Sequence, residues 1–420
     1  MTKRVALITH EMSLVGGLPT MITFLLQTLR ESGRYQADLF SLATSSSDRA
    51  SLRLSSPGTW LRRPIIENVP WHGEAFEHVG VWGSELEFQR YRPRRLLQEK
   101  LEQYDILQFV VGSPPWVCVA ENIKRPVLLW TATTTRADRA SRLQQDSRSR
   151  RAWSSLMVPL TVRFEARGLR RADRIFALSK YTQDAIKATA GSDRLSLAPC
   201  GVDTNLFRPA ENPVADYILC VARFSDARKN VRLLLDAYAQ LCSKLIQAPD
   251  LYLIGDPPSA DAQQQLQNLG IADKVKLIGP KRGQELAEIY RNAAFFVLSS
   301  DEEGLGIVIL EAMASGLAVV STDCGGPATV ITPGKTGLLS PVGDIAAFAG
   351  AMERLVRDSG LRKIMGAAAR RVAEEKFSFA VAGKVFLDAY DRIISEAPLR
   401  EGNGKHEKAL SPLPATASEQ

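Results

Sequence analysis

The feature that most constrains the fold is a regular alternation of short apolar segments with helical segments. It begins near the N-terminus with KRVALIT, ADLFSL, DILQFV, PVLLW and RIFAL, and it starts again later with YILCVA, LYLIG, KVKLIG, AFFVLSS and LAVVST. Buried strands of this kind that alternate with helices favour a parallel sheet covered by helices on both faces. The sequence therefore predicts an α/β fold with two similar doubly wound halves.

A domain boundary is predicted where this alternation is interrupted. The loop GVDTNLFRPAENPV contains two prolines and little periodicity, so we assign residues 1–208 to an N-terminal domain and 209–378 to a C-terminal domain. A helical segment follows at residues 379–396. The polar stretch 397–420, which contains prolines and glycines, is expected to be a disordered tail.

Composition favours a cytoplasmic protein. No run approaches the roughly 18 apolar residues of a membrane span, and the start, MTKRVALITH, lacks the apolar core of a signal peptide. The five cysteines are scattered without metal-ligand spacing, which favours reduced thiols.

The net charge of +7 is concentrated in one region. Residues 130–174 contain eleven arginines and four acidic residues, so this region alone carries 11 − 4 = +7. Such a patch attracts phosphates, acidic lipid surfaces or nucleic acid, although a solvated basic face without a dedicated partner explains it as well. Few aromatic residues interleave with the arginines, so we expect no nucleic-acid partner.

Residues 154–172 in this region could form a helix that lies on an anionic membrane. Near one face of that helix would fall Leu156, Leu160, Phe164 and Leu169, and largely off it Arg163, Arg167, Arg170 and Arg171. This arrangement indicates peripheral contact with the cytoplasmic membrane face. The alternative is that the apolar face packs on the sheet and the arginines are solvated.

Chemistry is expected in the strand-to-helix loops, because open α/β sheets bind ligands outside the carboxyl ends of their strands. Gly16 and Gly17 precede a helix, where backbone N–H groups can approach an anion. Arg223 follows a strand and Lys229 precedes a helix. Two cations there suit a diphosphate, although Arg228 makes the second cation ambiguous and solvated surface cations are the alternative.

The stretch DEEGLGIVILEAMASGLAVV adds two carboxylates. Glu303 lies in a loop with three residues whose backbone N–H groups can face the same ligand: Gly304, Leu305 and Gly306. Glu311 lies inside an apolar helix, where an unpartnered carboxylate is costly. Hydroxyl groups of a sugar and a ribose would satisfy both carboxylates, and a structural ion pair is the alternative for Glu311. With the two cations, this set of side chains fits a nucleotide diphosphate sugar.

The block EEGLGIVILEAMASGLAVV, with its Glu303-x7-Glu311 spacing, and ARFSDARKN strongly resemble the signature of the family 4 retaining glycosyltransferases of the GT-B fold. VGGLPTMITFL, ALSKYTQDAI, GVDTNLFRP, LYLIGDPP and GKTGLLSPVGD follow in the family's order, so the resemblance covers most of the chain. It implies two Rossmann-like domains that face a central cleft. It also implies that helix 379–396 crosses back to the N-terminal domain.

The resemblance implies roles for the site residues. The matches to Arg223 and Lys229 bind the donor diphosphate and stabilise its charge as it leaves. The match to Glu303 contacts hydroxyls of the donor sugar, as do the backbone N–H groups of the glycine loop. The match to Glu311 holds the donor ribose. The loop at residues 16–17 closes on the donor from the other domain.

The acceptor side departs from the family's pattern. Many members have a histidine after an N-domain strand, where LLWTATTTR here offers Thr131 or Thr133. Many also have asparagine before GVD, where this chain has Cys200. His10, at the end of the first strand, is a further acceptor-side candidate.

The sequence therefore predicts an enzyme that moves a sugar from a UDP- or GDP-sugar to a hydroxyl of a glycan or lipid-linked acceptor. No Asp-x-Asp pair marks a metal site, and we expect neither a metal nor another cofactor. Three rivals remain: a glycosyltransferase-like scaffold without turnover, a sugar-nucleotide epimerase of similar fold, and a nucleic-acid binder that uses the arginine-rich segment. Release of nucleotide from a donor, with and without acceptor, separates the first two. Salt-dependent binding to a duplex tests the third.

Overall fold

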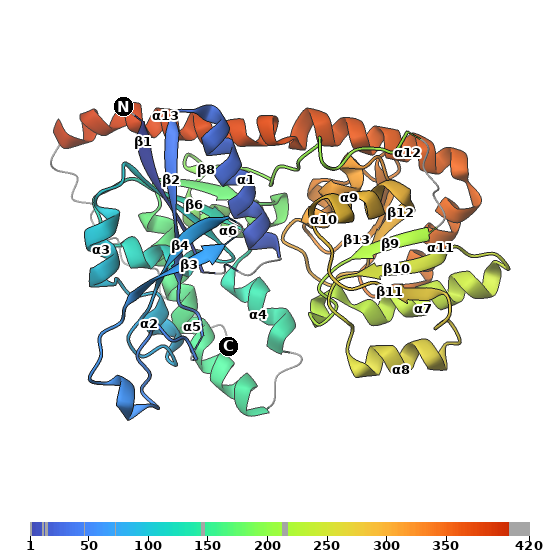
Figure 1. The fold of residues 1–420 in the computed structure, drawn as a ribbon, viewed down its shortest axis with the longest axis horizontal. Helices are drawn as coiled ribbons and strands as arrows, with labels where there is room; N and C mark the ends of the chain where they lie inside the picture. Colours follow the sequence, from blue (N-terminus) through green and yellow to red (C-terminus); the bar gives the residue numbers. More distant parts are fainter. Residues whose placement is uncertain are drawn as a thin grey trace, which may run out of the picture.

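The computed structural model describes residues 2–10, 12, 16–45, 47–71, 73–143, 148–211 and 217–402, and for 140–143, 148–156 and 397–402 it describes the backbone alone. Two α/β domains lie side by side (Figure 1). Each is built on its own sheet, one with eight strands and one with six. The α/β architecture with two doubly wound halves is therefore confirmed.

The N-terminal sheet has the strand order β3-β4-β2-β1-β5-β6-β7-β8. Its strands are β1 (Lys3–Thr9), β2 (Tyr35–Leu42), β3 (Ile66–Trp71), β4 (Glu74–Val79), β5 (Ile106–Val111), β6 (Val127–Thr131), β7 (Arg174–Ala177) and β8 (Leu195–Leu197). β3 pairs antiparallel with β4, and neighbouring strands from β4 to β8 are parallel. In the centre, Val5 of β1 lies opposite Ala37 of β2 and Ile106 of β5.

Helices cover both faces of this sheet. They are α1 (Gly17–Ser32), α2 (Glu87–Arg90), α3 (Arg95–Leu101), α4 (Thr135–Leu143), α5 (Arg148–Arg171) and α6 (Lys180–Ala190), with the 3₁₀-helices η1 (Pro57–Thr59) and η2 (Pro114–Ala120). Successive side chains of a strand point to opposite faces. In β1, Val5 and Leu7 therefore join the apolar layer that includes α1, whereas Ile8 joins the layer that includes α3, α5 and α6.

The C-terminal sheet has the order β11-β10-β9-β12-β13-β14, and all of these neighbouring pairs are parallel. Its strands are β9 (Tyr217–Val221), β10 (Asp250–Ile254), β11 (Val275–Leu277), β12 (Ala293–Leu298), β13 (Val319–Thr322) and β14 (Gly337–Ser340). Its helices are α7 (Val231–Lys244), α8 (Ala260–Asn268), α9 (Gly283–Asn292), α10 (Ile307–Ala314), α11 (Ile345–Arg357) and α12 (Ser359–Val372), with η3 (Ala227–Lys229) and η4 (Pro327–Thr329). Because β9 and β12 are neighbours, the loops after them meet at one edge.

The segment between the two sheets is held in place by hydrogen bonds. The Arg370 guanidinium of α12 donates to the carbonyls of Thr204, Phe207 and Ala314, at 2.6–3.1 Å. The backbone N–H of Val202 donates to the carbonyl of Phe377 at 2.7 Å. This connection therefore packs against the C-terminal domain, although it directly follows the N-terminal domain in sequence.

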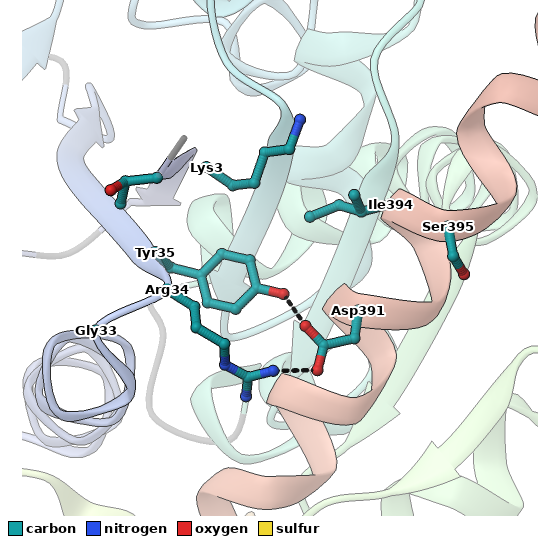
Figure 2. Close-up of a pocket in the computed structure, with 8 residues that line it drawn as sticks. Lys3, Gly33, Arg34, Tyr35, Asp391, Ile394 and Ser395 are labelled. Atoms are coloured by element: carbon teal, nitrogen blue, oxygen red, sulfur yellow. Dashed lines mark hydrogen bonds and ion pairs between the residues drawn. The ribbon is translucent and has the colours of Figure 1, made fainter.

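The last helix, α13 (Phe379–Gly402), returns to the N-terminal domain as the family resemblance implied (Figure 1). It follows a π-helical turn at Ala373–Phe377. The Tyr390 hydroxyl donates to Gln108 Oε1 of β5 at 3.0 Å. The Tyr35 hydroxyl donates to Asp391 at 2.5 Å beside an open cavity of about 490 Å³ (Figure 2). The crossing helix is thus docked by buried and half-buried polar contacts.

Two details of the fold differ from the sequence prediction. α13 continues to Gly402, so residues 397–402 of the expected tail are helical, since a helix can extend past its packed part; residues 403–420 lie outside the described residues. Residues 43–90, for which no helix or strand was predicted, contain β3 and β4. These strands at the sheet edge are half-exposed and carry polar residues, so they lack the apolar character of the central strands. In the described part of the chain, no helix combines the length and the apolar character that a membrane crossing needs.

Candidate functional site

Two loops at the carboxyl edge of the C-terminal sheet are joined by hydrogen bonds. The loop after β9 contains η3, and the loop after β12 leads into α10. The backbone N–H of Asp301 donates to the carbonyl of Arg228 at 2.7 Å, and the hydroxyl of Ser299 donates to the carbonyl of Lys229 at 2.9 Å. The charged side chains of both loops are therefore held at fixed positions relative to each other.

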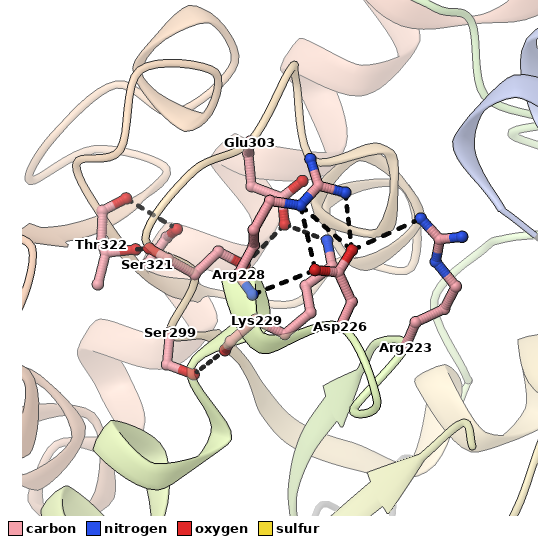
Figure 3. Close-up of polar contacts among 9 residues, drawn as sticks. Arg223, Asp226, Arg228, Lys229, Ser299, Glu303, Ser321 and Thr322 are labelled. Carbon is pink, nitrogen blue, oxygen red and sulfur yellow. Dashed lines mark hydrogen bonds and ion pairs between the residues drawn. The ribbon is translucent and has the colours of Figure 1, made fainter. Parts of the chain in front are cut away.

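The structure brings Lys229 and Glu303 into direct contact (Figure 3). Lys229 Nζ lies 2.5 Å from Glu303 Oε1, and the Ser300 hydroxyl donates to the same oxygen at 2.7 Å. The two charged side chains are only 16% and 11% exposed. Burial of this kind strengthens the attraction between the charges and reduces its screening by salt.

The neighbouring cations are arranged differently. Arg228 makes three hydrogen bonds of 2.7–3.2 Å with the carboxylate of Asp226 through its side chain. Burial alone would raise the pKa of Asp226, but the hydrogen bonds and charge of Arg228 lower it to about 2. The Arg223 guanidinium lies 3.7 Å from the same carboxylate and is about half exposed. Asp226, which the sequence reasoning missed, thus forms the ion pair with Arg228, whereas Lys229 contacts Glu303.

The glycine pair after β13 packs under the Glu303 loop. The backbone N–H of Gly326 donates to the carbonyl of Glu303 at 3.1 Å, and Glu303 forms a bridge with Gly325. A Cβ atom on Gly326 would lie 2.5 Å from the Glu303 carbonyl and 2.6 Å from the Leu305 nitrogen. This close approach requires glycine, and it makes TDCGGPATV part of the same site.

The glycine loop positions the start of α10. Gly306 has φ 81°, a left-handed conformation that suits glycine, and it caps the helix. The Leu305 side chain is buried, so only its backbone could meet a ligand. The first N–H groups of the helix have no intrahelical acceptor and carry partial positive charge. The Gly304–Gly306 loop therefore offers the backbone donors that the sequence predicted, next to Glu303.

Glu311 lies one turn into α10 and has a partner that the sequence did not reveal. The hydroxyl of Tyr290, on α9, donates to Glu311 Oε2 at 2.9 Å. Burial raises the pKa of Glu311 to about 7, although the Tyr290 hydrogen bond opposes this rise. A structural ion pair, which was the alternative for Glu311, is not what these contacts show. A tyrosine 21 positions away in sequence gives no local signal, so this pair could not be found by spacing.

The N-terminal domain meets this site through the loop after β6. A Cβ on Gly304 would lie 3.1 Å from the carbonyl oxygen of Ala132, which also accepts a 2.7 Å hydrogen bond from the Thr182 hydroxyl. The backbone N–H of Lys180 donates to the Thr329 hydroxyl across the domains at 3.0 Å. The two domains therefore touch beside the Glu303 loop. Gly16 and Gly17 start α1 in the N-terminal domain and are not part of the Lys229–Glu303 cluster.

The three acceptor-side candidates lie at the carboxyl ends of β1 and β6, the two strands that flank β5. His10 follows β1 and stacks on Trp116 with ring centroids 4.7 Å apart. The Thr131 hydroxyl is fully buried and donates within its own domain, to the carbonyls of Gly112 and Thr133 at 3.2 and 3.0 Å. Thr133 is 9% exposed. Of the two threonines, Thr131 is therefore occupied by structural contacts.

Of the two interpretations of residues 154–172, the structure supports the one in which the apolar face packs on the sheet. Phe164 and Leu169 of α5 are 8% and 2% exposed and belong to the core of the N-terminal domain. Arg167 pairs with Glu121, and Arg171 donates to backbone carbonyls. The membrane-facing interpretation of residues 154–172 is wrong for these residues, because the sheet needs their apolar side chains to cover it. The side chain of Leu156 lies outside the described part.

Two family models match the chain, and they meet at the connection between the domains. The model described as Glycosyltransferase Family 4 matches residues 15–206, and the model described as Glycosyl transferases group 1 matches residues 202–372. The chain belongs to glycosyltransferase family 4. The solved structure of Anabaena Alr3699/HepE in complex with UDP-glucose is 17% identical, with a TM-score of 0.69 over 93% of this chain and all of that one. This likeness shows the GT-B fold.

Curated relatives of this family 4 chain include a synthase and several proteins named as glycosyltransferases. N-acetyl-alpha-D-glucosaminyl L-malate synthase of Bacillus anthracis is 32% identical over 178 residues, which cover 42% of this chain and 45% of the relative. D-inositol 3-phosphate glycosyltransferase of Streptomyces avermitilis is 26% identical over 409 residues, which cover 89% of this chain and 82% of the relative. The chain spans about half of the length of the first curated relatives that it matches.

Proposed function

We propose that this chain transfers a sugar from a nucleotide diphosphate donor to an acceptor hydroxyl, with retention of the anomeric configuration. The observation that carries the proposal is that one ammonium group and two carboxylates lie together at the carboxyl edge of the C-terminal sheet. Lys229 lies 2.5 Å from Glu303, and Glu311 lies on the helix that starts four residues after Glu303. Each group has a matching partner in a nucleotide sugar.

The diphosphate is the part of the donor that needs cations. Lys229 has three N–H donors, so it can keep Glu303 and still bind a phosphate oxygen. The exposed Arg223 guanidinium can add a second cation, with the N-terminus of α10 close by. These groups stabilise the charge that develops as the diphosphate leaves, which is electrostatic catalysis. In this proposal no metal takes part in that step.

The carboxylates serve the hydroxyls of the donor. Glu303, with the backbone N–H groups of the glycine loop, holds the sugar beside the leaving diphosphate. Glu311 accepts hydrogen bonds from the ribose, and Tyr290 fixes its orientation. A carboxylate accepts through two oxygens, so one oxygen of Glu311 can serve Tyr290 while the other serves the ligand.

The acceptor would approach from the N-terminal domain, past the strand ends that carry His10 and Thr133. We propose a hydroxyl of a glycan or lipid-linked acceptor, with the donor supplied as UDP- or GDP-sugar. The five cysteines are unpaired, as in proteins of reducing compartments. This supports a reaction in the cytoplasm. Peripheral contact with the membrane is a separate part of the proposal and does not rest on the cysteines.

The test begins with thermal shifts of the protein in UDP-, GDP- and ADP-sugars, because a ligand that binds the folded state raises its melting temperature. The stabilising donor is then incubated with candidate acceptors, and nucleotide release is measured. Glu311→Gln should fold and lose most of the shift. Binding without release, with or without acceptor, would favour the inactive scaffold. The absence of a thermal shift with every donor would contradict the proposed donor site.

A further inference from the structure

An exposed apolar surface lies at the carboxyl edge of the N-terminal sheet, apart from the Lys229–Glu303 site. Residues 43–65 leave the sheet at the end of β2 and return at the start of β3. Near their turning point, Trp60 is 59% exposed and Leu61 is 98% exposed. In Figure 1 this blue excursion projects from the end of the domain opposite α13.

The excursion is anchored, so the exposure of these side chains is a fixed property of the fold. Trp60 Nε1 donates to the carbonyl of Arg53 at 2.9 Å. The backbone N–H groups of Leu54 and Ser55 both donate to the Glu85 carboxylate at 3.0 Å. At the base, the N–H of Ile65 donates to the carbonyl of Ala50 at 3.1 Å. An ordered loop that leaves a tryptophan and a leucine in water has a binding role as its simplest explanation.

The charge of the excursion indicates what it binds. Residues 43–65 contain four arginines and one acidic residue, Asp48. Arg62 and Arg63, which follow Leu61 directly, are both exposed. The nearby carboxylates are already engaged, Asp48 by His78 and Glu85 by backbone N–H groups. The hydrogen bonds from the Ser55 hydroxyl and from these backbone groups hold the pKa of Glu85 down to about 2, against the effect of burial.

Two further apolar side chains lie along the same excursion. Ile65 is 47% exposed and Trp82 is 51% exposed, and Trp82 pairs with Leu52 of the excursion through a backbone bridge. Tryptophan favours the boundary between lipid chains and head groups, and arginine binds anionic head groups. A protein partner would need a larger apolar area than one projecting tip.

We infer that the Trp60 surface, defined as Trp60 and Leu61 with Arg62 and Arg63, docks on an anionic membrane. The apolar tip enters the interface and the arginines meet lipid phosphates. β1, β2, β5 and β6 are parallel, so the excursion leaves from the same edge that carries His10 and Thr133. The membrane would therefore face the acceptor side. This assignment of a lipid-surface acceptor rests on the proposed glycosyl transfer.

The experiment is co-sedimentation of the full chain with vesicles of phosphatidylcholine alone or mixed with phosphatidylglycerol. Binding is expected only to the anionic vesicles and should fade at about 0.5 M salt. Arg62→Glu with Arg63→Glu should weaken it by about thirtyfold or more. Trp60→Ser with Leu61→Ser should weaken it by about tenfold or more. The matched control is Ile246→Ser, which removes a 98% exposed apolar side chain from the C-terminal domain and should bind as the wild type does.

A second measurement locates the contact without relying on the loss of binding. Brominated lipid should quench tryptophan emission in the wild type, and Trp60→Phe should reduce that quenching while the protein still sediments; Trp82, which is 51% exposed, accounts for quenching that remains. No binding to anionic vesicles, equal binding to neutral vesicles, or unchanged binding of the Trp60 and Leu61 variant would overturn the inference. Self-association that the same variant abolishes, without vesicle binding, would overturn it in favour of a second copy of the chain.

The two proposals can fail separately. Donor hydrolysis without vesicles should be the same in the Trp60 and Leu61 variant as in the wild type, because neither residue lies at the donor site. If the wild type releases no nucleotide but binds anionic vesicles through Trp60, glycosyl transfer fails and the membrane surface stands. If the wild type releases nucleotide but does not bind vesicles, glycosyl transfer stands and the membrane surface fails.

Discussion

The Lys229 ammonium and the Glu303 carboxylate lie 2.5 Å apart although 74 positions separate them in the chain. β9 and β12 are adjacent and parallel, so the loops that follow them meet at one edge. The adjacent Arg228 points into a different contact, with Asp226. The two consecutive basic residues thus have separate partners. Only Lys229 contacts Glu303, the carboxylate proposed to hold the sugar.

Lys229→Ala should lower nucleotide release more than Arg228→Ala. Lys229 is the cation placed to meet the leaving diphosphate, and removal of one such group costs about 10²–10³ in turnover. Arg228 is already neutralised by Asp226, so its removal should reduce turnover much less. The measurement is kcat for release of nucleotide from the stabilising donor. Equal losses in the two variants, or a larger loss for Arg228→Ala, would show that the cations are assigned in the wrong order.

Binding of the donor sugar nucleotide should weaken as the pH falls below about 7. Burial raises the pKa of Glu311 to about 7, so the ribose-accepting carboxylate is present above this pH and protonated below it. If binding needs the carboxylate, affinity falls by up to about tenfold per pH unit below the pKa. Calorimetry should use the intact nucleotide sugar, since a free terminal phosphate titrates near pH 6 itself.

Two variants separate Glu311 from other titrating groups. Glu311→Gln should bind weakly at every pH and lose the dependence near 7. Tyr290→Phe removes a hydrogen bond that lowers the Glu311 pKa, so it should move the midpoint to higher pH. A midpoint that persists in Glu311→Gln would assign the titration elsewhere.

The sequence predicted what depends on local pattern. Apolar strands, helix starts and the order of the loops follow from the residues themselves, and the family resemblance added the crossing helix. Partners that come from distant positions were missed. Tyr290 reaches Glu311 from the preceding helix, and Asp226 was overlooked although it decides where Arg228 points.

The membrane segment shows why an amphipathic pattern alone is ambiguous. An apolar stripe beside arginines in residues 154–172 fits a lipid surface and a sheet surface equally. Only the position of Phe164 in the core decides between them. The exposed pair Trp60 and Leu61 has no periodicity, so its signal appears only as exposure in the folded chain.

Gly326→Ala should disturb the donor loop although alanine suits the backbone conformation there. Gly326 has φ −57°, so the difficulty is the added Cβ, which would lie 2.5 Å from the Glu303 carbonyl. Overpacking of this kind costs about 1–3 kcal/mol, and a displaced Glu303 should lower both donor affinity and turnover.

The control for this substitution is Gly350→Ala in α11, where a new Cβ meets nothing within 4 Å. Alanine should stabilise that exposed helix position by about 1 kcal/mol or less and leave donor binding unchanged. If both variants behave alike in thermal melts and in calorimetry, the close packing under Glu303 is not needed for the site.

Tyr390→Phe tests how the crossing helix is held on the N-terminal domain. The Tyr390 hydroxyl donates to Gln108 Oε1 at 3.0 Å, and both residues are fully buried. Phenylalanine keeps the ring but takes the donor from a buried amide oxygen, which costs about 1–3 kcal/mol in the free energy of unfolding. Tyr252→Phe is the matched control, because its ring stacks on Tyr217 at 4.0 Å and keeps that contact without the hydroxyl. In urea unfolding, only Tyr390→Phe should shift the midpoint of the N-terminal domain. An unchanged midpoint in Tyr390→Phe would mean that the apolar contacts of Phe386 and its neighbours, rather than this hydrogen bond, fix α13 to the sheet.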